Sequence, residues 1–267
     1  MNELSLTAME ATAAAYEDGL VRALLRDCAG QLVEALAIRP GEAVLDVGCG
    51  TGIVARLAAV RCGASGQVTG LDPNPAMLAV ASRLAPGIEW REGRAESLPW
   101  PDASFGAVAS QFALMFFADR AAALAEIFRV LRPGGRLAVS VLDSLDANAG
   151  YAAMVAAFEA AAGSEVAGAL RFPFILGDPA EVSALFARAG IPGADIRRHE
   201  RTARFASVRD VALADIRGWF PFAGISLDEA TIERVVAEAE TRLAPFLAPD
   251  GSVSFPVFLH VVTARKV

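Results

Sequence analysis

The sequence predicts an α/β fold in which a doubly wound, mostly parallel sheet carries helices on both faces. Between residues 44 and 142, short apolar stretches rich in β-branched residues alternate with segments of helical spacing. Such alternation is typical of parallel strands joined by right-handed crossovers. A turn with three glycines follows the first stretch, and a hydrophobic content of 54% over 267 residues is enough for one large core. We therefore expect a single domain spanning residues 1–267.

Residue spacing and turn residues place the elements of the first half. Residues 11–36 have helical spacing and stop at Arg39-Pro40-Gly41, which predicts a helical cap over residues 1–40. The Pro133-Gly134-Gly135 turn is expected to end a helix and aim the next strand. The expected strands are 44–47, 68–71, 88–91, 106–111 and 136–142, and the expected helices are 53–62, 75–85 and 119–131.

Expected strands and helices alternate less regularly in the second half of the chain. A further helix is expected from near Ser207, and Ser226-x-x-Glu229 matches a capping box at the start of another. An aromatic loop is expected at 171–177. The remaining helices are expected at 146–163 and 179–189, and the remaining strands at 194–205 and 253–263.

The stretch VLDVGCGTG, Val44 to Gly52, is the most informative motif. An apolar strand ends in Asp46 and turns through Gly48 and Gly50 into a helix, which is the architecture of a nucleotide-cofactor site. Its G-x-G-x-G spacing is one residue short of the dinucleotide fingerprint G-x-G-x-x-G. NAD and FAD are therefore the second choice of cofactor.

The motifs that follow extend the pattern. VTGLD ends in Asp72 about 20 residues after the loop, as expected for an acid that binds ribose. The stretches GRAESLPWPDASF, AVASQFALMFF and RVLRPGGRLAVSV then occur in order. With these motifs, residues 15 to 143 resemble the class I S-adenosylmethionine (SAM)-dependent methyltransferases, in particular the type 11 group that includes the ubiquinone and menaquinone methyltransferases.

The resemblance implies a Rossmann-like sheet of seven strands, with an antiparallel C-terminal strand and helical insertions that cover the substrate. The insertions correspond to residues 145–178 and 206–248 of this chain. SAM is the implied cofactor and S-adenosylhomocysteine its product. The implied partner is a small organic acceptor.

The resemblance also implies which residues hold the cofactor. Asp46, Gly48, Cys49 and Gly50 correspond to the loop around the methionyl group, and Asp72 to the ribose acid. From its position alone, Asp72 is equally suited to cap a helix. The other implied contacts are Pro73 and Met77 beside adenine, Ala95 and Glu96 at its edge, Gln111 between cofactor and substrate, and Tyr16 folded over the cofactor.

Ordinary structural roles remain open for several of these residues. Pro73, Met77 and Tyr16 also suit core packing, and the amide of Gln111 also suits a role in satisfying loop backbone groups. Arg94 is a departure from the family, because many relatives carry Asp there and arginine cannot accept a hydrogen bond from the adenine amino group. Glu96 is then expected to take that contact, unless backbone and stacking hold adenine.

Methyl transfer from a sulfonium is an in-line displacement with a neutral leaving group, so it needs no acid. Alignment of the reactants can supply about 7 to 11 kcal/mol, and no side chain is assigned as a catalytic base. His199, in a basic strand, and His260, in an apolar one, are not assigned that role. Arg171 or Arg217 is a candidate partner for an acidic acceptor. An apolar pocket is expected from Tyr151, Phe158, Phe172, Phe174, Phe205, Trp219, Phe220 and Phe222, with Phe112, Met115 and Phe116.

Composition excludes other classes of function. A net charge of −7 and a pI near 5.0 argue against nucleic acid as a partner. Lys266 is the only lysine, which removes Schiff-base chemistry from the body of the fold. No export signal is visible, and the longest apolar stretch, 107–118, is too short to span a bilayer. Three cysteines without ligand spacing predict free thiols and no metal site.

These features favour a cytoplasmic protein of bacterial type. The alternative is a SAM-fold protein that binds the cofactor without methylating, either as an accessory subunit or as an enzyme for another reaction. The sequence leaves open the oligomeric state and whether oxygen, nitrogen or carbon is methylated.

Overall fold

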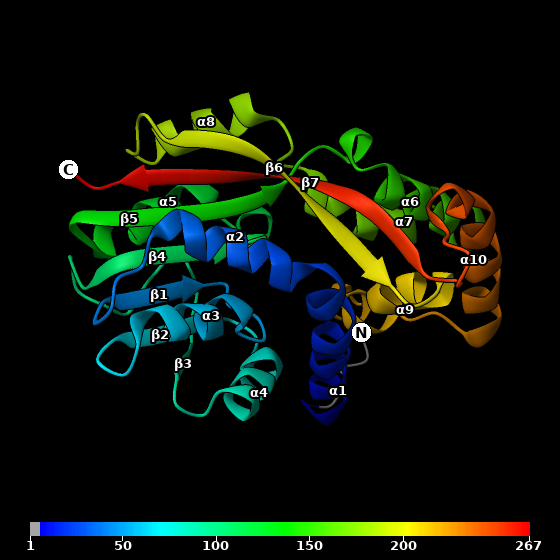
Figure 1. Ribbon diagram of the computed structural model, residues 1–267, viewed down its shortest axis with the longest axis horizontal. Helices are drawn as coiled ribbons and strands as arrows, with labels where there is room; N and C mark the ends of the chain where they lie inside the picture. The colour runs from blue at the N-terminus through cyan, green and yellow to red at the C-terminus, as the bar shows by residue number, and fades with distance from the viewer. Residues whose placement is uncertain (1–5) are drawn as a thin grey trace.

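A computed structural model, which describes residues 6–267, contains one seven-stranded sheet in the order β3-β2-β1-β4-β5-β7-β6 (Figure 1). The strands are β1 (Ala43–Val47), β2 (Gln67–Asp72), β3 (Glu89–Glu92), β4 (Phe105–Gln111), β5 (Leu131–Leu142), β6 (Asp195–Phe205) and β7 (Val253–Arg265). Strands β1 to β5 pair in parallel, and β7 lies antiparallel between β5 and β6. The predicted mostly parallel sheet with an antiparallel C-terminal strand is confirmed.

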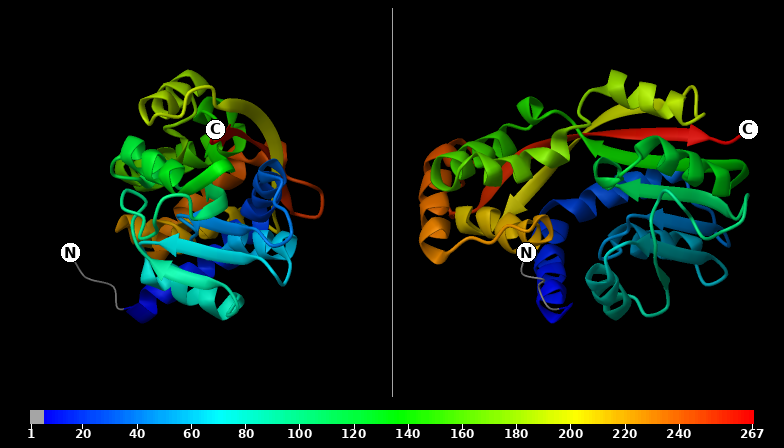
Figure 2. Two further views of the ribbon diagram at one scale, coloured as in Figure 1. Left: turned by 90° about the vertical axis from the view of Figure 1, so that its left-hand side faces the viewer. Right: turned by 180° about the vertical axis from the view of Figure 1, so that it is seen from behind.

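Helices cover both faces of the sheet because the buried side chains of each parallel strand alternate between two sides. One core cluster joins α2 and α3 to one face, and the other joins α5 and α8 to the opposite face (Figures 1 and 2). The helices are α1 (Leu6–Tyr16), α2 (Arg26–Leu36), α3 (Ile53–Cys62), α4 (Pro75–Leu84), α5 (Arg120–Val130), α6 (Ala149–Ala162), α7 (Ser164–Arg171), α8 (Pro179–Arg188), α9 (Val208–Gly218) and α10 (Glu229–Arg242).

The direction of winding reverses between β1 and β4. From β1 the chain proceeds outward through β2 and β3, and then returns to place β4 on the other side of β1. Ligands of open α/β sheets bind at the carboxyl ends of the strands at such a switch point. Gly48 follows β1 and Gln111 ends β4, so both lie at this edge.

A helical lobe, formed by α6, α7, α9 and α10, extends from the antiparallel end of the sheet. Strands β6 and β7 are long and continue into this lobe, and the view from behind shows its helices gathered beside them (Figure 2). Phe158 and Phe220 meet at 4.9 Å between ring centroids in its interior and are fully buried. The predicted lid insertions, 145–178 and 206–248, supply all four helices.

The N-terminal helix α1 lies between the lobe and α4, and contacts both α4 and α9 (Figure 1). Residues 6–36 form one helical run that changes to π-helical hydrogen bonding in η1 (Glu17–Leu25). A π-helical stretch widens the helix and occurs frequently at functional sites. The first five residues of the predicted cap over 1–40 lie outside the described residues.

Three local predictions differ from the structure. Helix α10 is capped by Asp228, which accepts from the backbone N–H of Thr231, so the capping box assigned to Ser226 is wrong. Asp competes well with Ser as an N-cap, and it lies next to the first helical residue. Strand β5 begins at Leu131, directly after α5, and the Pro-Gly-Gly turn forms a register shift inside it. Helix α7 was not predicted.

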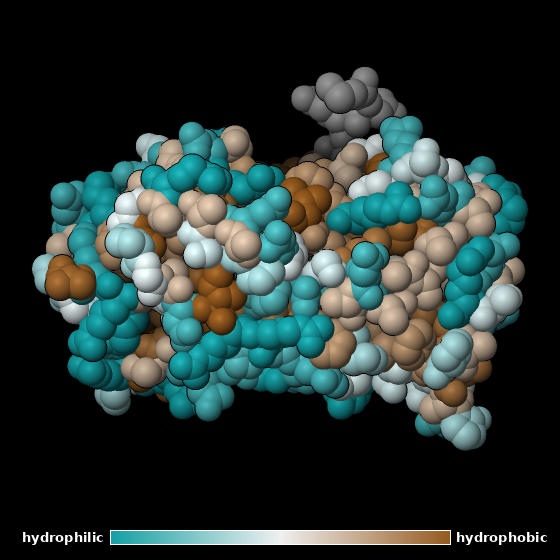
Figure 3. All heavy atoms as spheres, turned by 90° about the horizontal axis from the view of Figure 1, so that it is seen from above, coloured by the Kyte–Doolittle hydropathy of each residue, from teal (hydrophilic) through white to brown (hydrophobic). Residues whose placement is uncertain are grey.

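Charged side chains protect the exposed edge of the sheet. The edge strand β6 carries Arg197, which pairs with Asp195 at 2.7 Å, and Arg198, which pairs with Asp143 at 2.6 Å. Charges on an edge strand oppose pairing with another chain. Figure 3 looks down on this upper side, and hydrophilic side chains cover much of it. No helix within residues 6–267 has the length and apolar character needed to cross a bilayer.

Candidate functional site

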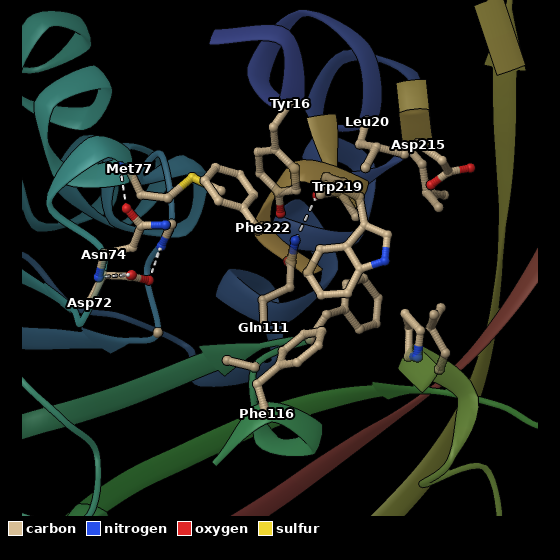
Figure 4. Close-up of a pocket in the computed structure, with 18 of the residues that line it drawn as sticks. Tyr16, Leu20, Asp72, Asn74, Met77, Gln111, Phe116, Asp215, Trp219 and Phe222 are labelled. Carbon is tan, nitrogen blue, oxygen red and sulfur yellow. Dashed lines mark hydrogen bonds between the residues drawn. The ribbon is translucent and has the colours of Figure 1, made fainter. Parts of the chain in front are cut away.

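A cavity of about 450 Å³ lies at the switch point, between the parallel strands and the helical lobe (Figure 4). Its size falls in the usual range of small-molecule sites, about 300 to 1,000 Å³. One end lies beside the turn that carries Gly48 and Gly50, which we call the glycine loop. This glycine-loop end is lined by Gly48, Gly50, Asp72, Pro73, Asn74 and Met77. The aromatic end is lined by Leu20, Leu24, Leu25, Phe112, Phe116, Leu142, Tyr151, Leu170, Pro173, Phe174, Asp215 and Trp219, whereas Phe117 lies beside Gly48. Tyr16, Gln111, Ala113 and Phe222 complete the lining.

The glycine loop requires the absence of side chains. Gly48 has φ +70°, and a Cβ there would lie 2.4 Å from the Cβ of Ala113. Gly50 has φ +54°, and a Cβ there would project into the cavity, with Tyr16 Cε1 as its nearest neighbour at 4.0 Å. Left-handed backbone favours glycine, so the loop both turns sharply and leaves its backbone open to a ligand.

Asp72 joins the glycine loop to the start of α4. Its Oδ2 accepts from the backbone N–H of Gly50 at 2.8 Å, and its Oδ1 accepts from that of Asn74 at 2.9 Å (Figure 4). The cap of α4 is Asn74, whose Oδ1 accepts from Ala76 at 3.0 Å, so the alternative in which Asp72 caps the helix is wrong. Burial raises the pKa of the Asp72 carboxyl, and the two backbone hydrogen bonds oppose this rise.

Asp46 lies beneath the loop and is 1% exposed. Its Oδ2 accepts from the backbone N–H of Ala55 at 3.0 Å, whereas no group of the described residues donates to its Oδ1. Burial raises the pKa of this carboxyl to about 7. A buried acceptor without a donor is costly, but Asp46 does not line the cavity, so Oδ1 is not within reach of a ligand in this structure.

Gln111 holds the end of η1 against the sheet. Its Nε2 donates to the backbone carbonyl of Leu25 at 3.0 Å, which is the structural role considered for this amide. Its Oε1 is buried and has no donor within residues 6–267. Gln111 lines the cavity between its two ends, so one side of the amide is used by the fold and the other remains for a ligand.

The remaining predicted cofactor residues lie outside the cavity lining. Cys49 and Ala95 are buried, with 6% and 3% exposure. Glu96 accepts from the backbone N–H of Ala118 at 2.7 Å and lies 3.7 Å from the guanidinium of Arg94. Glu96 therefore supports the start of α5 in this structure, and its predicted contact with adenine stays a prediction.

The N-terminal helix is tied to the glycine loop. The carboxylate of Glu17 accepts from the Thr51 hydroxyl at 2.6 Å and pairs with Arg56 at 2.6 Å. Tyr16 thereby faces the cavity near Gly50 (Figure 4), and its predicted place over the cofactor stays a prediction. Its phenol has a pKa above the usual value because of burial and the nearby Asp72.

The residues predicted to form the apolar pocket divide into two sets, apart from Phe172, which is exposed and does not line the cavity. Phe158, Phe205, Phe220 and Met115 are buried in the core. Phe112, Phe116, Tyr151, Phe174, Trp219 and Phe222 line the cavity. Phe116 lies 5.0 Å from Trp219 and 5.5 Å from Phe172 between ring centroids, so the turn after β4 meets the helical lobe through these rings. Phe112 has φ +49°, a conformation that bulky residues adopt rarely and that clusters at functional sites.

Sequence reasoning missed Asp215. This residue lies on α9, lines the cavity and is 3% exposed. Its Oδ2 is buried without a hydrogen-bond donor among the described residues, and burial raises its pKa to about 7. The available signal was an acid on the apolar face of α9, between Ala214 and Ile216. Arg171 and Arg217, the predicted partners for an acidic acceptor, do not line the cavity; Arg171 pairs with Glu159 at 2.6 Å.

Neither histidine lies in the cavity. His260 is buried in β7, with Nε2 3.1 Å from the carbonyl of Gly177 and 3.4 Å from Asp143 Oδ1. It fastens the loop before α8 to the sheet. His199 lies on the edge strand β6, and burial, with nearby Arg201 and Arg197, lowers its pKa. Across residues 6–267, no group of three or more His, Cys, Asp or Glu side chains is arranged to hold a metal ion.

Comparison with known proteins decides the family of the central segment. Residues 45–139 match the family described as "Methyltransferase domain", of the type 11 group. The chain is 39% identical over 120 residues to malonyl-[acyl-carrier protein] O-methyltransferase of Serratia marcescens, covering 45% of this chain and 46% of that protein. Residues 45–139 are a class I methyltransferase domain.

A second relative supports the assignment of residues 45–139, but it too matches only part of the chain. Over 92 residues the chain is 46% identical to demethylmenaquinone methyltransferase of Chlorobaculum parvum, covering 34% of this chain and 37% of that protein. The match thus spans less than half the length of either relative. A candidate methyltransferase from Bacillus halodurans has the same fold, with 21% identity, a TM-score of 0.60 and coverage of 89% of this chain and 98% of that chain.

SAM is the cofactor of a methyltransferase domain of this group, and the residues present fit it. The loop offers open backbone at Gly50, Asp72 offers lone pairs beside those already used, and Gln111 Oε1 lacks a donor within the described chain. The acid suits a cofactor with ammonium and sulfonium groups. In such a domain, Asp72 would hold the ribose hydroxyls and the glycine loop the methionyl part.

Proposed function

We propose that the protein transfers the methyl group of SAM to a small, mostly apolar organic acceptor. The observation that carries this proposal is a single cavity with two chemically different ends. The glycine-loop end has the open backbone and the acid that suit the cofactor. The aromatic end has large apolar side chains, which suit an apolar acceptor.

The cofactor supplies a methyl group on a positively charged sulfur and leaves as a neutral thioether. The chain's own contribution is alignment and exclusion of water. Phe116, Trp219 and Tyr151 surround the aromatic end, and Tyr16 lies across from Gly50. Holding two reactants in an attacking pose can be worth about 7 to 11 kcal/mol, so this mechanism does not depend on a catalytic base.

The proposed cofactor residues are Asp46, Gly48, Cys49, Gly50, Asp72, Pro73, Ala95, Glu96 and Gln111. Five of them, Gly48, Gly50, Asp72, Pro73 and Gln111, line the cavity. Asp46 accepts from the backbone of Ala55 in α3, and Cys49 is a buried residue of the loop itself. A cytoplasmic location, and a substrate other than nucleic acid, are further parts of the proposal.

The test is methyl transfer from SAM with a labelled methyl group to fractions of small bacterial metabolites. Label is expected in apolar, low-molecular-weight products, with S-adenosylhomocysteine formed in equal amount. The Gly50→Ala variant serves as the inactive control. Tight SAM binding with no labelled product from any fraction would favour the alternative, a protein that binds the cofactor without methylating.

A further inference from the structure

We propose that Asp215 selects the acceptor, and that the acceptor is an apolar molecule carrying an amine that is protonated in water. This inference rests on the proposed function and adds the charge class of the substrate to it. It arises from a side chain that neither the sequence motifs nor the family comparison assigns.

Asp215 is a buried carboxyl that lacks a partner among the described residues. It is 3% exposed, and no donor among residues 6–267 reaches its Oδ2, although it lines the cavity. An acid on the apolar face of a helix destabilises the fold unless something compensates its desolvation. A ligand that brings a positively charged donor would provide this compensation.

The described residues that line the cavity offer no such cation. The ionisable side chains that line the cavity are Tyr16, Asp72, Tyr151 and Asp215, so none of the described lining residues is basic. Arg217, two residues further along α9, is exposed. An acceptor with a carboxylate would therefore meet like charge and find no counter-ion, whereas an ammonium group would find one.

The cofactor does not account for Asp215. Figure 4 shows Asp72 on one side of the cavity and Asp215 on the other, with Tyr16, Gln111 and Phe222 between them. Asp72 already lies at the glycine loop, bonded to the backbone of Gly50. The second acid thus belongs to the part of the cavity that the acceptor is proposed to occupy.

The surroundings of Asp215 favour an amine over a hydroxyl. At the aromatic end, the ring centroids of Trp219 and Phe116 lie 5.0 Å apart, and those of Tyr151 and Phe174 lie 5.4 Å apart. Aromatic faces attract an ammonium group but offer a hydroxyl no comparable gain. The pKa of the Tyr151 phenol is raised by burial and by Asp215, so this neighbour keeps its proton and adds no charge.

The test uses four probes that share one phenylethyl scaffold: an amine, an alcohol, a carboxylate and the plain hydrocarbon. Their binding to the full chain saturated with S-adenosylhomocysteine is measured by calorimetry near neutral pH. The amine is expected to bind about tenfold more tightly than the alcohol, and the carboxylate more weakly than the hydrocarbon. Equal binding of amine and alcohol would overturn the proposal.

Asp215→Asn is the matched variant, since it keeps the shape and removes the charge. It is expected to weaken amine binding about tenfold and to leave binding of the alcohol unchanged. Asp146→Asn, which removes an exposed acid in η3 (Leu145–Ala147), is the control and should behave as wild type. If the Asn variant does not fold, Asp215→Leu replaces it.

The outcomes separate this inference from the proposed function. If wild type fails to bind S-adenosylhomocysteine, the proposed function falls and the inference with it. If it binds the cofactor product but does not prefer the amine, only the inference falls. A variant that loses affinity for SAM and keeps it for S-adenosylhomocysteine would assign Asp215 to the sulfonium and also overturn the inference.

Discussion

Substitution of Gly50 by alanine separates backbone strain from blockage of the cofactor site. Gly50 has φ +54°, and its Cβ would project into the cavity, 4.0 Å from Tyr16 Cε1. The left-handed conformation costs a residue with a Cβ about 1 to 2 kcal/mol. In a chain of this size, that loss lowers the melting temperature by about 2 to 8 °C.

Gly190→Ala is the matched control. Gly190 has φ +77°, nothing lies within 4 Å of its Cβ, and it follows α8 outside the cavity. It therefore carries the same type of strain without obstructing a ligand. Both variants should lose a similar free energy of unfolding, whereas only Gly50→Ala should lose SAM binding.

Thermal unfolding with and without SAM measures both effects. A ligand at 100 times its Kd stabilises a protein by about 2.7 kcal/mol, which corresponds here to about 5 to 11 °C. Wild type and Gly190→Ala should show this rise, and Gly50→Ala should show none. If SAM protects Gly50→Ala as fully as wild type, the cofactor does not approach this backbone and the assignment of the glycine-loop end is wrong.

Three further predictions concern the acids and the lobe. Asp72→Asn should weaken SAM binding in calorimetry by about 10- to 150-fold, since a hydrogen bond to a charged group is worth about 1.5 to 3 kcal/mol; unchanged affinity would remove Asp72 from the ribose site. Phe220→Ala, at a fully buried ring, should lower the free energy of unfolding in urea by about 3 to 5 kcal/mol. Phe172→Ala, at a ring 38% exposed, should lower it by less than about 1 kcal/mol, and equal losses would mean that the lobe has no packed interior. Because burial raises the pKa of Asp46 and Asp215 to about 7, above the unfolded value of about 3.9, the folded state binds more protons between these values. The ligand-free protein should therefore lose stability as pH rises from about 4 to about 7, and Asp46→Asn should flatten this decline; a profile that rises over this range would contradict the burial of these acids.

The sheet was predictable from sequence because its signals are local. Apolar runs bounded by glycine and proline mark buried parallel strands, and the observed strands of the first half begin and end within one residue of the expected limits, except at the start of β5. At the start of β5, the register shift depends on the pairing of Leu131 with Phe105, which is distant from it in the sequence. Spacing alone carries no information about such a partner.

The glycine loop and Asp72 were predictable for the same reason, since residue type and spacing are tied to backbone geometry. Two other roles depended on tertiary contacts. Glu96 bonds to the backbone of Ala118, and the π-helical stretch brings Leu20 and Leu24 to the cavity. Neither contact has a signature in the local sequence.

Asp215 is the clearest example of this limit. An acid in a helix usually faces solvent, and the one local signal against this is that Asp215 falls at helical spacing from Val208 and Val211, on the apolar face of α9. Its burial follows from the packing of α9 against η1 and the rest of the lobe. Only the assembled structure reveals that it lines a cavity and lacks a donor within the described chain.

The central claim is that the cavity at the switch point binds SAM. Calorimetric titration of the wild-type protein with SAM, S-adenosylhomocysteine and NAD, in parallel, tests it most directly. Micromolar binding of the first two, with no heat from NAD, is the predicted result. No binding of SAM or S-adenosylhomocysteine, or binding of NAD in their place, would contradict the account.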